Sequence, residues 1–109
     1  MKTQNERGML TEAIQEKARA FLGEEITVKE LRLYPFLDYC WKNGGRIQRG
    51  KTDLEEEKIL ERREKQGHCE TTYIGENKPT REFYNFVNDI LAEAYVVMKN
   101  EVTENENTI

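Results

Sequence analysis

The spacing of apolar residues predicts two amphipathic helices, one near each end of the chain. The first apolar run stops at Gly23 and consists of Leu10, Ile14, Ala18, Phe21 and Leu22. The second is opened by Pro79 and Thr80, and its stripe consists of Phe83, Phe86, Val87, Ile90, Ala94, Val97 and Met98. Such spacing places apolar side chains on one face of a helix. We therefore predict helices over 10–22 and 80–98.

Three further side chains widen the stripe of the C-terminal helix, namely Tyr84, Leu91 and Tyr95. A stripe of this width exceeds what one neighbouring element covers. We predict that this flank is an interface with another protein or with a second copy of the chain. The alternative is that these residues belong to the core.

The segment that follows Gly23 begins with a capping signal and is interrupted by a proline. Thr27 and Glu30 have the spacing of a capping box, in which each side chain binds the backbone amide of the other residue. Pro35 lacks the amide that a helix interior needs. We predict a short helix that ends near Tyr34 and a second helix with Pro35 in its first turn. The alternative is one kinked helix.

The central part of the chain predicts a polar helix and one strand. Residues 53–66 are rich in helix formers but have a poor apolar face, which is typical of a helix that is solvated or lies against a partner. Residues 69–74 predict a strand ended by Gly75. We predict that residues 46–49 pair with this strand.

Together these elements predict an α+β fold that is mainly α, with three or four helices and a two- or three-stranded β element. A chain of 109 residues is long enough for one domain with a modest core. We predict a flexible N-terminus over 1–8, a globular domain over 9–99 and a disordered acidic tail over 100–109.

Composition restricts the location of the protein. The net charge is −4, and no apolar run approaches the roughly 18 residues that a membrane span needs. The N-terminus lacks the apolar segment of a signal peptide. We predict a cytoplasmic protein in which Cys40 and Cys69 are free thiols; one disulfide in an exported protein is the alternative.

Residues 45–52 satisfy the P-loop pattern G-x-x-x-x-G-K-[ST], with Lys51 and Thr52 at the phosphate- and Mg²⁺-binding positions. A working P-loop follows a buried strand. Here the preceding segment, which ends Asn43-Gly44-Gly45, is typical of a helix C-terminus. A nucleotide-binding protein is therefore the third hypothesis, and we interpret the glycines as serving backbone geometry.

Few residues offer catalytic chemistry. The chain has no serine, which removes serine-nucleophile mechanisms, and its one histidine is His68. His68 and Cys69 are adjacent, so on a strand they point to opposite faces. Cys40, His68 and Cys69 lack the paired spacing of a structural zinc site. We predict packed cysteines, an exposed histidine, and no metal, cofactor or catalytic residue.

A basic stretch provides an alternative binding site. Lys42, Arg46, Arg49 and Lys51 follow Trp41 without an intervening acid, and positive charge beside an aromatic residue is typical of nucleic-acid contact. The chain is similar in layout to a winged helix. The similarity lies in the order of its helices, the Gly-Arg-Ile stretch and the later Thr-Thr-Tyr-Ile strand, and it would imply nucleic-acid binding. The chain departs from that layout because residues 31–45 are too few for a turn and a full recognition helix.

The sparse reactive residues, the polar helix and the wide apolar stripe favour a small non-enzymatic protein. We predict a regulatory or inhibitor-type accessory protein that binds another protein or itself. An accessory protein of a mobile element or phage is one hypothesis for a chain of this kind. A nucleic-acid-binding module that uses the basic stretch is the alternative.

Overall fold

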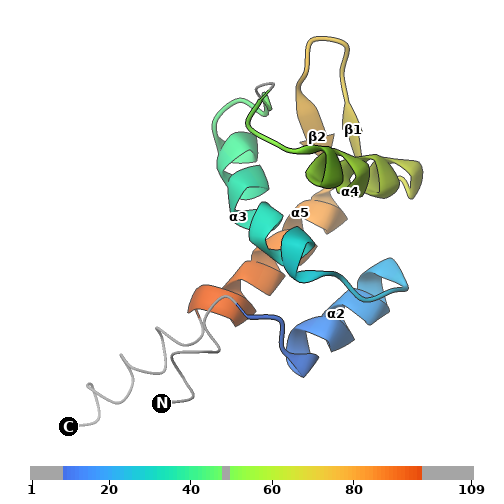
Figure 1. Cartoon of the computed structure of the whole chain (residues 1–109), viewed down its shortest axis with the longest axis vertical. Coiled ribbons are helices and arrows are strands. Elements are labelled where there is room, and N and C mark those ends of the chain that lie inside the picture. The colour runs from blue at the N-terminus through green and yellow to red at the C-terminus, as the bar shows by residue number, and fades with distance from the viewer. Residues whose placement is uncertain (1–8, 48–49, 97–109) are drawn as a thin grey trace, which may run out of the picture.

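A computed structural model describes residues 9–47 and 50–96, which form four α-helices and a two-stranded antiparallel sheet (Figure 1). The elements are α2 (Glu12–Leu22), α3 (Val28–Lys42), α4 (Leu54–Lys65), β1 (Cys69–Thr71), β2 (Asn77–Pro79) and α5 (Arg81–Leu91), and α5 continues into the π-helical turn η1 (Ala92–Val96). The predicted fold class, mainly helical α+β with a small sheet, is confirmed. The proposed terminal segments 1–8 and 100–109 lie outside the described residues.

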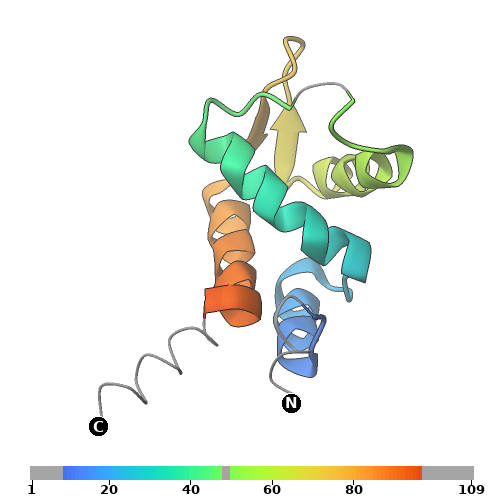
Figure 2. The ribbon, with the colours of Figure 1, turned by 60° about the vertical axis from the view of Figure 1, so that its left-hand side comes forward.

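The core forms where α5 meets α2, α3 and β2. In the view of Figure 2, α3 runs diagonally, with α5 and α2 below it and α4 and the hairpin above it. Helix α5 begins at Thr80, whose hydroxyl accepts a hydrogen bond from the amide of Phe83, 3.0 Å away. The predicted stripe is buried at Phe83, Phe86, Val87, Ile90 and Ala94. Val97 and Met98 lie outside the described residues.

The first predicted helix is confirmed as α2. Thr11 caps its N-terminus, and Gly23 ends it with a φ of 79°, a left-handed conformation that glycine adopts without strain. The predicted apolar face is buried at Ile14, Ala18 and Leu22. This element is therefore set by local signals that the sequence displays.

Helix α3 is continuous through Pro35, so the prediction of two shorter helices was wrong. Pro35 is exposed, whereas Leu33, Tyr34 and Leu37 around it are almost fully buried. The packing of both halves of α3 against the core outweighs the hydrogen bond that proline removes, which costs about 3 kcal/mol. The capping box is also only half formed. The Thr27 hydroxyl accepts from the Glu30 amide at 3.1 Å, but the Glu30 carboxylate binds elsewhere.

The strand after α4 pairs with β2 and not, as predicted, with the segment 46–49, of which residues 48 and 49 lie outside the described residues. Cys69 lies opposite Pro79, and Thr71 lies opposite Asn77. The described part of the earlier segment meets the hairpin at its second half, through an isolated bridge between Arg46 and Glu76 and a hydrogen bond of 3.2 Å from the Ile47 amide to the Gly75 carbonyl. A short loop closes the hairpin at a smaller entropic cost than pairing across the whole of α4 would require. The hairpin projects from the end of the molecule opposite the start of α2 (Figure 1).

Helix α4 is attached to the rest of the protein by a buried charge. Leu60 and Arg63 are its only buried residues. The Arg63 guanidinium donates two hydrogen bonds of 2.8 Å to the carboxylate of Glu30 on α3, and Tyr34 donates a third to Glu30 at 2.6 Å. A second acid, Glu24, accepts from Arg63 at 2.6 Å. The apolar pattern of α4 gave no sign of this attachment.

Replacing Arg63 with alanine would leave the Glu30 carboxylate buried without its partner. We expect the free energy of unfolding to fall by about 3–5 kcal/mol, measured by urea denaturation at pH 7. Arg62→Ala is the matched control because Arg62 is an exposed neighbour that also binds Glu24. Its removal should cost less than about 1 kcal/mol. Equal losses in the two variants would contradict this account of α4.

Candidate functional site

The P-loop-like segment lies between two helices, not between a strand and a helix. Gly45 follows α3, and its carbonyl accepts a hydrogen bond from the Asn77 amide at 2.8 Å. A side chain at Gly45 would approach the carbonyl oxygen of Asn77 to 3.2 Å, and the φ of Gly45 is 83°. Close approach to the hairpin and a left-handed backbone therefore explain this glycine without a phosphate, as the sequence interpretation expected.

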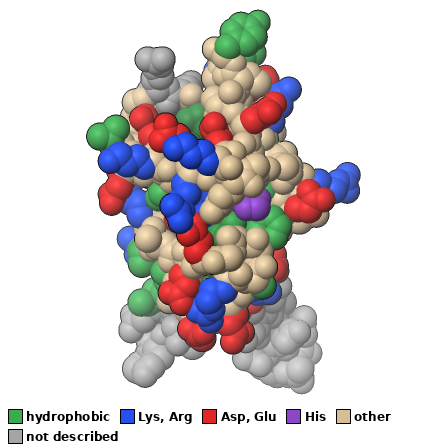
Figure 3. All heavy atoms as spheres, turned by 90° about the vertical axis from the view of Figure 1, so that its right-hand side faces the viewer, with side chains coloured by type: hydrophobic (Ala, Val, Ile, Leu, Met, Phe, Trp, Pro, Cys, Tyr) green, Lys and Arg blue, Asp and Glu red, His purple; other side chains and the backbone are tan. Residues whose placement is uncertain are grey.

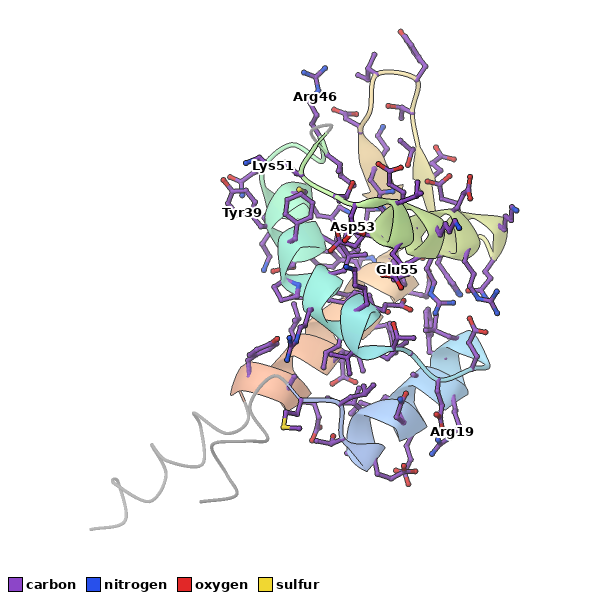
Figure 4. All side chains as sticks on the ribbon, viewed as in Figure 1. Arg19, Tyr39, Arg46, Lys51, Asp53 and Glu55 are labelled. Carbon is purple, nitrogen blue, oxygen red and sulfur yellow. The ribbon has the colours of Figure 1, made fainter. Side chains whose placement is uncertain are left out.

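The start of α4 is occupied by protein carboxylates. Asp53 accepts from the Glu56 amide at 2.8 Å, and the Glu56 side chain accepts from the Asp53 amide at 2.9 Å. Glu55 and Glu57 add further negative charge to the first turn, and Figure 4 shows Asp53 and Glu55 together there. The amides of Asp53 and Glu56 at the start of α4 are thus already bound to carboxylates and are not free to hold an anion.

The basic stretch is divided among different environments. Lys42 forms an ion pair of 2.9 Å with Asp38. Arg46 and Lys51 are exposed on the connector between α3 and α4, at the hairpin end of the molecule (Figure 4). Arg49 lies outside the described residues. The structure therefore brings Arg46 and Lys51 to one end and ties Lys42 to its own helix.

Trp41 is turned toward the interior. Its indole N–H donates to the side-chain oxygen of Asn77 at 2.9 Å, and its ring lies 5.7 Å from Phe83 and 5.9 Å from Tyr84 between centroids. The side chain is half-buried. Trp41 thus contributes to packing between α3, the hairpin and α5.

The two thiols are free and buried, as the sequence interpretation expected. Burial raises the pKa of Cys40, and it raises the pKa of Cys69 to about 11, so both stay protonated near neutral pH. The prediction of an exposed His68 was wrong. Its ring lies 4.9 Å from Phe21 and 5.4 Å from Phe83, and burial lowers its pKa. The described residues contain no cluster of three metal-ligating side chains.

The buried charged cluster of Arg63, Glu30 and Tyr34 is bonded mainly within the protein, because four of the five N–H groups of the Arg63 guanidinium donate to neighbouring side chains. The Arg63 guanidinium donates to Glu30, Glu24 and Gln66. Burial lowers the pKa of Arg63, but hydrogen bonds from its guanidinium to Glu30 outweigh this effect and raise it above its usual value. Burial and the neighbouring Glu30 raise the pKa of Tyr34 well above its usual value. Arg63 and Tyr34 therefore each keep one protonation state near neutral pH, and with Glu30 they form a structural cluster.

The predicted interface residues separate into two places. Tyr84 is half-buried against Trp41. Leu91 and Tyr95 line an open groove of about 560 Å³ between α3 and the end of α5 with η1. The other lining residues are Pro35, Asp38, Lys42, Asn88 and Ala92. The structure thus joins Leu91 to Tyr95 and gives Tyr84 a role in packing.

The hairpin tip is a surface that the sequence reasoning missed. Tyr73 is 100% exposed and Ile74 is 47% exposed. Figure 3 shows hydrophobic side chains at the far end of this projection, above a surface where acidic and basic side chains are mixed. The signal that could have found them is the turn: apolar residues immediately before Gly75 lie at the tip if the chain reverses there.

No family model, curated protein or solved structure matches this chain. Within residues 9–47 and 50–96, no helix combines the length and the apolar character that crossing a bilayer would require. A functional proposal for this protein rests on the chemistry of its exposed and buried groups.

Glu24 makes the stability of the fold dependent on acid pH. Hydrogen bonds from Arg62 and Arg63 lower the pKa of Glu24 to about 2. A carboxylate with a lowered folded-state pKa stabilises the protein above its unfolded pKa of about 4.3 and loses this effect as the pH falls toward 2. We expect the urea midpoint to fall over this range and to fall less in Glu24→Gln. An equally steep fall in that variant would contradict the assignment to Glu24.

Proposed function

We propose that this chain is a small cytoplasmic protein that binds another protein as a regulator or inhibitor-type accessory protein. The observation that carries the proposal is the complete exposure of Tyr73 beside Ile74 on a projecting hairpin. An aromatic and an aliphatic side chain held away from the body can enter an apolar cleft of a partner. Tyrosine is among the residues that contribute most to binding energy in such interfaces.

The base of the hairpin is rigid, which favours binding. Asn77 is buried, its amide donates to Gly45, and its side chain joins Trp41 and Thr71. At the tip, the Thr72 hydroxyl accepts from the Glu76 amide at 3.1 Å, and the Gly75 amide donates to the Thr72 carbonyl at 2.9 Å. A preorganised loop loses less conformational entropy when it binds.

A non-enzymatic role is supported by the state of the reactive groups. Both thiols are buried and have raised pKa values. His68 is half-buried and packs against the rings of Phe21 and Phe83. Two cysteines that remain free also support a reducing compartment. None of these groups is arranged as an activated nucleophile with a base.

Tyr73→Ala should abolish partner binding without changing stability, because the side chain makes no buried contact. We expect affinity capture with the immobilised protein, followed by mass spectrometry, to recover a partner that this variant loses. The free energy of unfolding should change by less than about 0.5 kcal/mol. Leu54→Ala is the matched control, since Leu54 is 70% exposed on α4 and should be neutral. A partner retained equally by both variants would refute the role of the tip.

A nucleic-acid-binding module is the second candidate. It is favoured by the position of Arg46, whose guanidinium lies 3.4 Å from the Ile74 carbonyl, and of Lys51 at the same end of the protein. A hairpin with basic residues at the same end of the protein can contact a phosphate backbone. Arg49, in the same connector, belongs to this candidate through its sequence position.

Salt dependence tests this second candidate. Binding of a labelled duplex, followed by fluorescence anisotropy, should weaken steeply as salt rises. Replacing Arg46 and Lys51 with alanine should reduce the slope of log K against log salt by about 1.8. Lys58→Ala with Lys65→Ala removes the same charge from α4 and should leave the slope unchanged. Absence of binding at low salt would eliminate this candidate.

A further inference from the structure

The groove between α3 and the end of α5 with η1 is bordered by two stripes of helical residues. On α3 the stripe consists of Pro35, Asp38, Tyr39 and Lys42, with the spacing of one helix face. On α5 and η1 it consists of Asn88, Leu91, Ala92 and Tyr95, with the same spacing. Tyr39 is 65% exposed. This face therefore combines aromatic and aliphatic surface with one acid and one base.

Asp38 is incompletely satisfied in this face. Its Oδ2 atom accepts from Lys42 at 2.9 Å, but its Oδ1 atom is buried and has no hydrogen-bond partner. A buried carboxylate oxygen without a donor is costly. A second cation close to Asp38 would relieve that cost after a small rotation of the carboxylate. The face therefore favours an occupant that brings positive charge to Asp38.

The charges of α3 are complementary to their own reversed copy. Asp38 and Lys42 lie one helical turn apart on the same side of the helix. When two such helices pack antiparallel about a two-fold axis near residue 40, Asp38 of each copy meets Lys42 of the other. A two-fold interface uses the same patch on both subunits, so this self-complementarity is what such symmetry requires.

We infer that this face binds a second copy of the chain, giving a two-fold dimer through α3 and the end of α5. Tyr39, Leu91 and Tyr95 supply the apolar contact, and two Asp38–Lys42 pairs set the antiparallel register. An unrelated partner would need to match both the apolar groove and this charge order, whereas a second copy matches the charge order by symmetry. The lining of the groove contains no hairpin residue. The dimer is therefore independent of the function proposed for the tip.

Two variants with opposite charges test the dimer. Asp38→Lys gives the face two positive charges, and Lys42→Asp gives it two negative charges. Each variant alone repels its own copy, so sedimentation equilibrium should show dimerisation at least about tenfold weaker than in the unmodified protein. An equimolar mixture should recover dimers, because the positive face of one variant meets the negative face of the other. The ion pair within each chain is lost in both variants, so recovery reports only on contact between chains.

The control uses an ion pair of the same kind elsewhere. Lys17 on α2 and Asp89 on α5 are 3.1 Å apart and partly exposed. Lys17→Asp and Asp89→Lys should each dimerise as the unmodified protein does. Circular dichroism checks that every variant is folded. If Asp38→Lys does not fold, Tyr39→Lys replaces it, since Tyr39 is exposed and a positive charge there should weaken the dimer by at least about tenfold while still pairing with Lys42→Asp in the mixture.

Four results would overturn the inference. One is an unmodified protein that remains monomeric at the highest concentration measured. Another is a charge variant that dimerises as tightly as the unmodified protein. The third is a mixture of the two charge variants that stays monomeric. The fourth is a control variant that loses dimerisation to the same extent as the charge variants.

Discussion

The ion pair between Arg63 and Glu30 is the interaction on which the second half of the chain depends. Helix α4 buries only Leu60 besides Arg63, so apolar packing alone gives it little attachment. The Arg63 side chain fixes α4 to α3, and the Arg63 carbonyl accepts from the His68 amide at 2.9 Å immediately before β1. A shift of α4 along α3 would leave a buried charge unpaired, which costs several kcal/mol. The pair thus specifies position as well as stabilising the contact.

Asn77 connects the hairpin to the rest of the fold. It is 1% exposed, and its backbone and side chain reach the connector at Gly45, the indole of Trp41 and the hydroxyl of Thr71. A buried amide of this kind is stable only when its donors and acceptors are paired. Because these partners come from α3, the connector and β1, Asn77 holds together segments distant in sequence. The same contacts turn Trp41 inward and leave Tyr73 outward.

The surfaces that remain available differ in chemistry. The hairpin tip presents an aromatic and an aliphatic side chain on a rigid support, whereas the groove presents helical stripes with one acid and one base. The reactive side chains are mostly enclosed: both cysteines are buried, and His68 is packed against Phe21 and Phe83. The binding role proposed for this protein rests on these exposed side chains.

The sequence by itself determined the elements whose signals are local. The Thr11 cap and Gly23 delimit α2, Thr80 and the apolar stripe delimit α5, and the helix-rich composition of 53–66 predicted α4. These signals act between residues a few positions apart, so they are visible in the chain. Tertiary structure decided the rest. Packing on both sides of Pro35 keeps α3 continuous, and the short loop between them makes β2 the partner of β1. The Glu30 carboxylate binds Arg63, 33 positions away, and so does not complete the capping box with Thr27. Contacts over such separations depend on which surfaces meet after folding, and no local pattern records that.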